Sequence, residues 1–294
     1  MLKIERVLCP TDFSEYSSKA YDYAQSLAKH YDAKLFLEHV VQPLTSAYPY
    51  YAFPDSVNEI NWNLYANAER QLQEFMKVHT RNGRQPECVV HEGIATNAIL
   101  SFAEKQSVDL IVMGTHGRHG VDRLTMGSVA EKVLRKARCP VLVVRKPAHD
   151  FVATGEKGSA VDLRRILFCT DFSEHSDKAL TYALSLAMEY NAELTLLHVL
   201  EDVPASTDLQ VATAAIATKL QEPIPHDAPS WCSIKTAVRV GKPHEEIIQL
   251  ATESETDLVV MGVRGRSGLD LALFGSTTHR VIQLGPCPVL AVHI

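Results

Sequence analysis

The sequence predicts an α/β protein in which parallel sheets carry helices on both faces, and it predicts this arrangement twice. Short apolar runs alternate with segments whose apolar residues recur at helical spacing, as expected of β-α-β units. The pattern starts again at Arg165, and more than half of the positions from Arg6 to Val40 are identical in the second copy. Both copies also contain the same Gly-rich segment between a strand and a helix. We therefore expect a duplicated domain.

Local patterns place the elements of the first copy. Ser14 is a suitable cap for the first helix, because its hydroxyl can accept a free N–H of the first turn. The apolar stripe from Ala20 to Tyr31 fits a helix lying on a sheet. Further helices are expected at Asn61–Thr80, at Ala95–Glu104 and after Ser128. Strands are expected at five apolar runs, namely Ile4–Pro10, Lys34–Val41, Glu87–His91, Leu110–Met113 and the run after Pro140.

Two stretches differ from this alternation. Residues 43–65 contain three prolines and six aromatic residues, which favour a structured loop, either packed on its domain or forming a dimer contact. Residues 148–163 are rich in Gly, Thr, Ser and charges, a composition typical of a flexible linker. This divides the chain into one domain at 1–147 and a second at 164–294, which has a shorter middle region.

Composition excludes several classes of protein. Apolar residues make up 46% of the chain and charged residues 22%, as in globular proteins, and the net charge of −6 argues against duplex nucleic acid as a partner. No apolar run reaches the roughly 18 residues of a membrane span, and the N-terminus does not resemble a signal peptide. The six cysteines lack C-x-x-C spacing, so we expect reduced thiols and a cytoplasmic protein.

The Gly-rich segment carries the most specific motif. The pattern G-x2-G-x9-G-[S/T] occurs after the fourth strand of each copy, and an aspartate ends each first strand. These positions are Asp12, Gly114, Gly117, Gly127 and Ser128 in the first copy, and Asp171, Gly262, Gly265, Gly275 and Ser276 in the second. In this combination the chain resembles the universal stress protein family over nearly its whole length.

The resemblance implies a Rossmann-like, five-stranded parallel sheet of order 3-2-1-4-5 in each domain. It also implies a regulatory, stress-response protein of the ATP-binding subclass, with Mg²⁺ or Mn²⁺ bound through the phosphates. Family members commonly pair through the last strand. The cofactor-binding positions are then Pro10, Thr11, Asp12, Val40, Met113, Gly114, His116, Gly117, Arg118, Gly127, Ser128 and Val129, and in the second copy Thr170, Asp171, Val199, Met261, Gly262, Arg264, Gly265, Arg266, Gly275, Ser276 and Thr277.

Physical reasoning agrees with this site. In the implied strand order, the first and fourth strands flank the topological switch point, where open α/β sheets bind ligands. The glycines would let the backbone approach phosphates, and the N-terminus of the following helix favours anions. Asp12 would take the ribose hydroxyls or a cation, while Val40 and Met113 would line the adenine. Taken singly, each glycine could instead serve only a turn, and each serine only a helix cap.

Other residues beside the site have simpler roles. His39 and His198 end their strands, where we expect packed, hydrogen-bonded rings, and His116 and His119 lie in an exposed loop. The two copies also differ at the end of the first strand and in the Gly-rich loop, where Pro10 is replaced by Cys169, His116 by Arg264 and Arg123 by Leu271. Neither site loses its cationic character outright, and the sequence does not say which site binds more tightly.

Two other functions remain as alternatives. One is an ATP hydrolase or adenylyl-transfer enzyme, but the sequence has no Walker-type motif and no compact His/Asp/Ser array, so at most slow hydrolysis is expected. No residue is assigned a catalytic role. The other is a ligand-free interaction protein, against which the intact glycines of both copies argue.

The apolar runs Cys139–Val144 and Cys287–Val292 should lie at the edges of their sheets, and unpaired apolar edges invite association. We expect them to face each other within one chain, and a homodimer through residues 48–65 is a further expectation.

Overall fold

The structure is a computed structural model. It describes residues 2–43, 54–80, 85–115, 126–145, 150–155, 158–201, 203–204, 208–226, 228, 231–263 and 275–293. Side chains are described for all of these except 54–59 and 153–160.

The first half of the chain alternates strands and helices. Its strands are β1 (Arg6–Pro10), β2 (Lys34–Val41), β3 (Glu87–Glu92), β4 (Leu110–Gly114) and β5 (Val141–Val144). Its helices are α1 (Glu15–His30), α2 (Pro54–His79), α3 (Ala95–Lys105) and α4 (Ser128–Lys136). The five strands pair in parallel in the order β3-β2-β1-β4-β5, as expected.

The second half repeats this plan. Its strands are β8 (Arg165–Cys169), β9 (Glu193–Leu200), β10 (Ile234–Val240), β11 (Leu258–Gly262) and β12 (Val289–Val292). Its helices are α5 (Glu174–Tyr190), α6 (Leu209–Gln221), α7 (Pro243–Glu253) and α8 (Ser276–Leu284). The order β10-β9-β8-β11-β12 is again 3-2-1-4-5, which confirms the predicted fold class.

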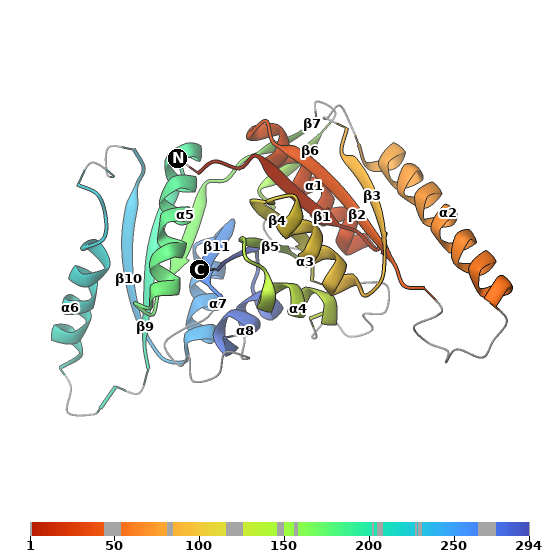
Figure 1. The fold of residues 1–294 in the computed structure, drawn as a ribbon. Coiled ribbons are helices and arrows are strands. Elements are labelled where there is room, and N and C mark those ends of the chain that lie inside the picture. The colour runs from red at the N-terminus through yellow and green to blue at the C-terminus, as the bar shows by residue number, and fades with distance from the viewer. Residues whose placement is uncertain are drawn as a thin grey trace.

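The two sheets join at their last strands. β5 and β12 pair antiparallel, with Leu142 opposite Leu290, and a single sheet of ten strands results. The expected pairing of the two apolar edges within one chain is therefore present. Helices α2 and α6 lie at the two outer ends of the molecule, and both chain termini lie near its middle (Figure 1).

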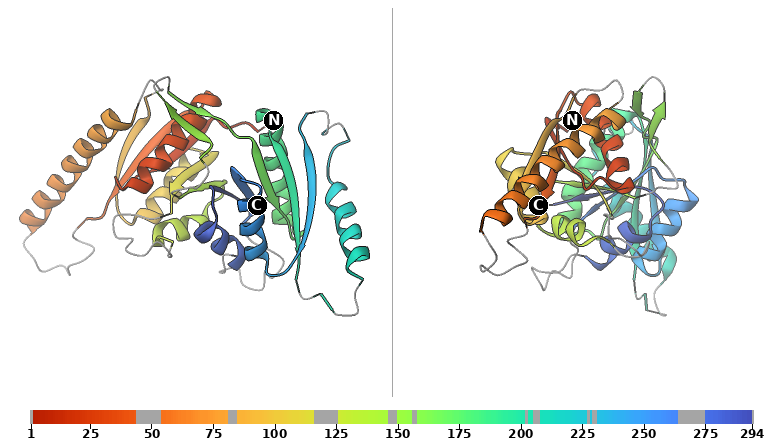
Figure 2. Two further views of the ribbon diagram at one scale, coloured as in Figure 1. Left: turned by 180° about the vertical axis from the view of Figure 1, so that it is seen from behind. Right: turned by 90° about the vertical axis from the view of Figure 1, so that its right-hand side faces the viewer.

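Two core layers cover the faces of this sheet. One face is packed by the helices that follow the first and second strands of each half, α1, α2, α5 and α6, and includes the fully buried Tyr21 and Tyr23. The other face is packed by α3, α4, α7 and α8. Each layer contains buried residues from both halves, so the hydrophobic core continues across the junction. Figure 2 shows the ribbon of helices and strands from behind and from the side.

Arg145, which directly follows β5, links the halves by polar contacts. Its Nη1 donates to the carbonyl of Gln283 and, at 3.2 Å, to that of Gly285, at the C-terminal end of α8. His293, which follows β12, places Nε2 at 2.6 Å from the Leu134 carbonyl of α4. Each half therefore contacts the end of the other half's last helix.

Two local expectations were wrong. The stretch 148–163, predicted to be a flexible linker, contains an antiparallel pair, β6 (Val152–Gly155) and β7 (Gly158–Val161), next to the buried Phe151. Helix α2 begins at Pro54, within the stretch predicted to be a loop, because proline is favoured in the first turn of a helix. Residues 44–53 lie outside the described chain. The domain boundaries at 147 and 164 stay a prediction.

Within the described residues, no helix is long and apolar enough to cross a membrane.

Candidate functional site

The first strand of the first domain ends in a turn whose side chains fix the backbone. Thr11 Oγ1 accepts the N–H of Phe13 at 3.1 Å, and Asp12 Oδ1 accepts the N–H of Ser14 at 3.1 Å. Ser14 Oγ accepts the N–H of Ser17 at 3.2 Å and caps α1, as predicted. The half-buried carboxylate of Asp12 is thereby held at the carboxyl end of β1.

The backbone of this turn is strained at Phe13. Its φ of 64° lies in the left-handed region, which costs a residue other than glycine about 1–3 kcal/mol. The ring of Phe13 lies 4.4 Å from that of His39, and His39 Nδ1 donates to the carbonyl of Thr11 at 2.7 Å. His39 therefore has the packed, hydrogen-bonded role that we expected, and it holds the turn in place.

The second domain repeats the turn bond for bond. The N–H of Phe172 donates to Thr170 Oγ1 at 2.9 Å, and the N–H of Ser173 donates to Asp171 Oδ1 at 3.1 Å. Phe172 has a φ of 59°, and His198 Nδ1 donates to the carbonyl of Thr170 at 2.8 Å. The left-handed φ at the matching position shows that both domains build this turn in the same way.

The helix after each Gly-rich segment begins directly after the last glycine of the motif. Gly127 is the N-cap of α4 and, as a glycine, has no side chain to cap the first turn, where Ser128 is exposed. The N–H of Gly127 donates to the carbonyl of Thr115 at 2.8 Å, and the N–H of Thr115 to that of Val144 at 3.1 Å. The start of α4 is thus fastened to the ends of β4 and β5, with first-turn N–H groups suited to an anion.

Helix α8 begins in the same way. Its N-cap, Gly275, donates its N–H to the carbonyl of Val263 at 3.2 Å and carries no side-chain cap. Ser276 is exposed, whereas Thr277, like Val129 of the first domain, is half-buried. The predicted phosphate-side residues of the described chain therefore occupy matching places in both domains.

Gly114 is required by packing between β4 and α1. A Cβ at this position would lie 2.9 Å from the backbone C and O atoms of Tyr16, in the first turn of α1. Gly262 has the same relation to His175, whose backbone C atom would be 2.9 Å away. This contact brings the end of β4 against the helix that follows Asp12, so the predicted phosphate and ribose sides of the site are neighbours.

The predicted adenine walls differ in how accessible they are. Val40 and Pro10 are half-buried at the ends of β2 and β1, where a ligand could reach them. Met113 and Met261 are only 5% exposed and belong to the core on the α3 side. Val199 is 9% exposed.

The remaining predicted residues of the loops lie outside the described part of the chain. They are His116, Gly117, Arg118, Arg264, Gly265 and Arg266.

Sequence reasoning missed two features of the first site. The close approach of Tyr16 to Gly114 is a tertiary contact that no local pattern indicates. The second feature is Glu38, which is 0% exposed in the middle of β2 and lies 2.7 Å from His91 of β3. A charged residue within the apolar run L-F-L-E-H-V-V was a readable signal.

A separate apolar cavity of about 40 Å³ lies between α1 and α5, near the N-terminus of the chain. Leu27, Leu110, Leu186 and Leu258 are among its lining residues. Leu110 and Leu258 begin β4 and β11, so this cavity is at the opposite end of the strands from the turn of Asp12. Its volume suits a few waters at most, and we do not assign it to the site.

Comparison with known proteins places this geometry in a family. The sequence profile of the universal stress protein family matches residues 3–145 and again 162–293. A universal stress protein of Methanocaldococcus jannaschii is 37% identical over 151 residues, which cover 50% of this chain and 85% of the relative. One from Mycolicibacterium smegmatis is 25% identical over 293 residues, covering 97% of this chain and 96% of the relative.

A solved structure has the same architecture over nearly the full length. The crystal structure of a universal stress protein from Archaeoglobus fulgidus matches with a TM-score of 0.66 and 24% identity, covering 98% of this chain and 95% of that one. At this identity the likeness concerns the fold. Because the profile accounts for both halves of the chain, the protein belongs to the universal stress protein family, of which it carries two domains in tandem.

Proposed function

We propose that each domain binds one adenine nucleotide at the carboxyl ends of its strands and that the protein acts as a nucleotide-responsive regulator in the stress response. The observation that carries this proposal is the doubled pairing of an Asp-containing, strained turn with a helix N-terminus whose N-cap is glycine. Both flank the gap between the first and fourth strands, where the sheet order reverses.

The helix start supplies the phosphate side. The first turn of α4 offers backbone N–H groups, the positive end of the helix dipole and the exposed hydroxyl of Ser128. Ser276 and α8 offer the same groups in the second domain. A triphosphate fits this chemistry better than a neutral ligand.

The aspartate supplies the sugar side. Oδ1 of Asp12 accepts the N–H of Ser14, which fixes the carboxylate at the carboxyl end of β1. A carboxylate at this place can accept hydrogen bonds from the ribose hydroxyls. It also suits Mg²⁺ or Mn²⁺, which would take their other ligands from phosphates and water. The ion would neutralise phosphate charge beside Asp12.

Regulation fits the site better than turnover does. The hydroxyl of Thr11 lies 3.1 Å from that of Ser17 and also accepts the N–H of Phe13, so it serves the turn. Six free thiols suit a reducing compartment, and we propose that the protein resides in the cytoplasm.

Calorimetry with MgATP on variants at the two helix starts tests this function. Ser128→Glu places a carboxylate where a phosphate would lie, yet an acidic residue in the first turn suits the helix dipole and should preserve the fold. We expect wild type to bind two nucleotides per chain, Ser128→Glu and Ser276→Glu to bind one each, and the double variant to bind none.

Ser128→Gln is the matched control, because it has the same shape as glutamate without the charge, and it should keep both sites. Wild-type protein that binds no ATP at millimolar concentration would refute the proposal, as would a double variant that still binds two.

A further inference from the structure

The middle of β2 contains a carboxyl group that the proposed site does not yet use. Glu38 is 0% exposed and follows three buried apolar residues of the strand, Leu35, Phe36 and Leu37. Burial raises the pKa of Glu38, and the hydrogen bond to His91 opposes this only in part. Its Oε1 lies 2.7 Å from His91 Nδ1, and its Oε2 has no hydrogen-bond partner among the described residues.

His91 connects this buried group to the surface. It stands near the carboxyl end of β3, its side chain is 38% exposed, and its ring lies 5.3 Å from that of Phe102 in α3. In the strand register Val40 is opposite His91, and Pro10 is opposite Glu38. Neighbouring strands are about 4.8 Å apart, so the pair adjoins both accessible residues of the proposed adenine wall.

The proton count of the pair decides what His91 offers. Only Glu38 of this pair is buried, and an uncompensated carboxylate there is costly, so a pair without net charge is favoured. Two arrangements are net-neutral: a carboxylate beside an imidazolium, or a carboxylic acid beside a neutral imidazole whose Nδ1 accepts. In both of them Nε2 carries a hydrogen. His91 therefore presents an N–H donor on the side of the ring away from Glu38.

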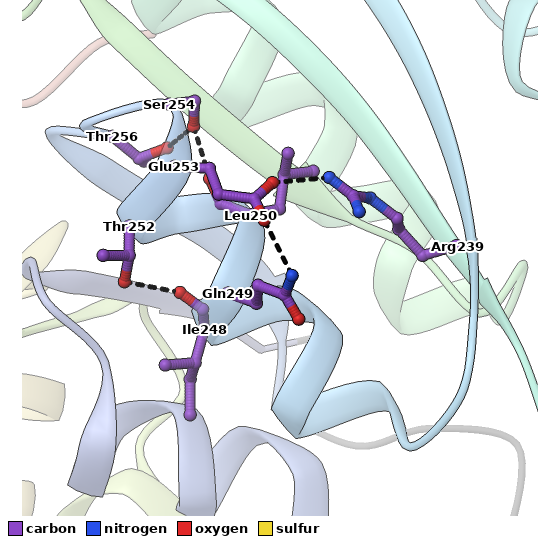
Figure 3. Close-up of polar contacts among 8 residues, drawn as sticks. All are labelled: Arg239, Ile248, Gln249, Leu250, Thr252, Glu253, Ser254 and Thr256. Atoms are coloured by element: carbon purple, nitrogen blue, oxygen red, sulfur yellow. Dashed lines mark hydrogen bonds and ion pairs between the residues drawn. The ribbon is translucent and has the colours of Figure 1, made fainter.

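The second domain has no such pair. Leu197 takes the place of Glu38, and Arg239 takes the place of His91, opposite Val199 in the register. Arg239 is drawn toward α7, where its Nη2 lies 2.6 Å from Glu253 Oε2 (Figure 3). Glu253 also accepts from Gln249 in the same helix. Arg239 is thus engaged by α7, and the carboxyl–imidazole pair is specific to the first domain.

We propose that His91 is a specificity-determining contact of the first nucleotide site, with its Nε2–H donating to an unprotonated ring nitrogen of the purine. Glu38 is the positioning residue that orients the ring. Adenine has acceptor nitrogens on both edges of the base, whereas guanine carries a hydrogen on N1. The inference rests on the proposed function and adds to it a base-reading group that only one of the two domains has.

The test measures ATP binding at the first site alone, in protein whose second site is blocked by Ser276→Glu. His91→Phe keeps a flat ring against Phe102 and removes the donor. It should weaken ATP binding about three- to tenfold, the range of a single net hydrogen bond. Glu38→Leu copies the second domain and should also weaken binding, because it leaves His91 unoriented. Arg239→Phe in the same protein is the matched control and should leave the affinity unchanged.

Analogues that lack one ring nitrogen locate the contact. We expect either 1-deaza-ATP or 7-deaza-ATP to bind weakly to protein with His91 and to lose nothing further in His91→Phe. Circular dichroism confirms that each variant is folded. The inference is overturned if His91→Phe binds ATP as tightly as its parent. It is also overturned if His91→Phe weakens the binding of both analogues as much as it weakens the binding of ATP. A parent that binds no ATP overturns the proposed function together with the inference, which separates the two failures.

Discussion

Replacement of Gly114 by alanine tests whether this glycine is retained for packing or for the ligand. The added Cβ would lie 2.9 Å from the C and O atoms of Tyr16 and 3.1 Å from its Cβ. Ordinary contacts begin near 3.4 Å. Two of the three atoms belong to the backbone of the first turn of α1, so the clash cannot be relieved by a side-chain rotation.

The expected loss of stability follows from this overlap. Inserting a methyl group into a well-packed place costs about 1–3 kcal/mol, and for domains of this size each kcal/mol lowers the melting temperature by about 2–4 °C. We therefore expect Gly114→Ala to melt roughly 2–12 °C below wild type. Gly262→Ala should behave alike, because its Cβ would lie 2.9 Å from the backbone of His175 and 3.0 Å from its Cβ.

Thermal and urea unfolding followed by circular dichroism measures both variants. Ser128→Ala is the control, since it changes an exposed residue at a helix start and should shift stability by no more than about 0.5 kcal/mol. Wild-type stability in both glycine variants would refute the packing argument. A loss of ATP binding without a loss of stability would assign Gly114 to the ligand instead.

Three further predictions concern other parts of the chain. Arg145→Ala removes a donor to the carbonyls of Gln283 and Gly285 and should lower the free energy of unfolding, measured in urea, by about 1.5–3 kcal/mol. An unchanged free energy of unfolding would contradict a stabilising link between the halves. Because burial raises the pKa of Glu38 above 4.5, the folded state keeps that proton to higher pH than the unfolded state. The free energy of unfolding of wild type should therefore fall relative to that of Glu38→Gln as pH rises from about 4.5. A difference in unfolding free energy between the two proteins that does not change with pH would contradict this. Burial raises the pKa of Cys88 to about 11, so native protein at pH 8 should react with iodoacetamide on the order of a hundredfold slower there than unfolded protein; equal rates would contradict this burial.

The architecture was predictable because hydrophobic period and strand length are local properties. Strand β2 was predicted with the bounds that it has, Lys34–Val41, and the apolar edges that should pair, β5 and β12, do pair. The start of α2 was missed because Pro54 was counted as a sign of a loop, although proline also opens helices. The β6-β7 pair was missed because Gly, Thr, Ser and charged residues make up six of residues 152–161 and obscure an antiparallel pair next to Phe151.

The site was predictable only in part, for a physical reason. Asp12 and Gly127 could be placed because strand order brings the ends of β1 and β4 together. The left-handed φ of Phe13 and the closeness of Tyr16 to Gly114 depend on tertiary packing, which a linear pattern does not contain. The burial of Glu38 likewise depends on which face of β2 α3 covers.

A crystal structure of the protein grown with ATP and Mg²⁺ tests the central claim most directly. The account predicts two nucleotides per chain, one with its phosphates at the first turn of α4 beside Ser128 and its ribose toward Asp12. The other should lie in the same way at Ser276 and Asp171. Nucleotide bound anywhere else, such as the junction between α1 and α5, or no nucleotide at saturating concentration, would contradict it.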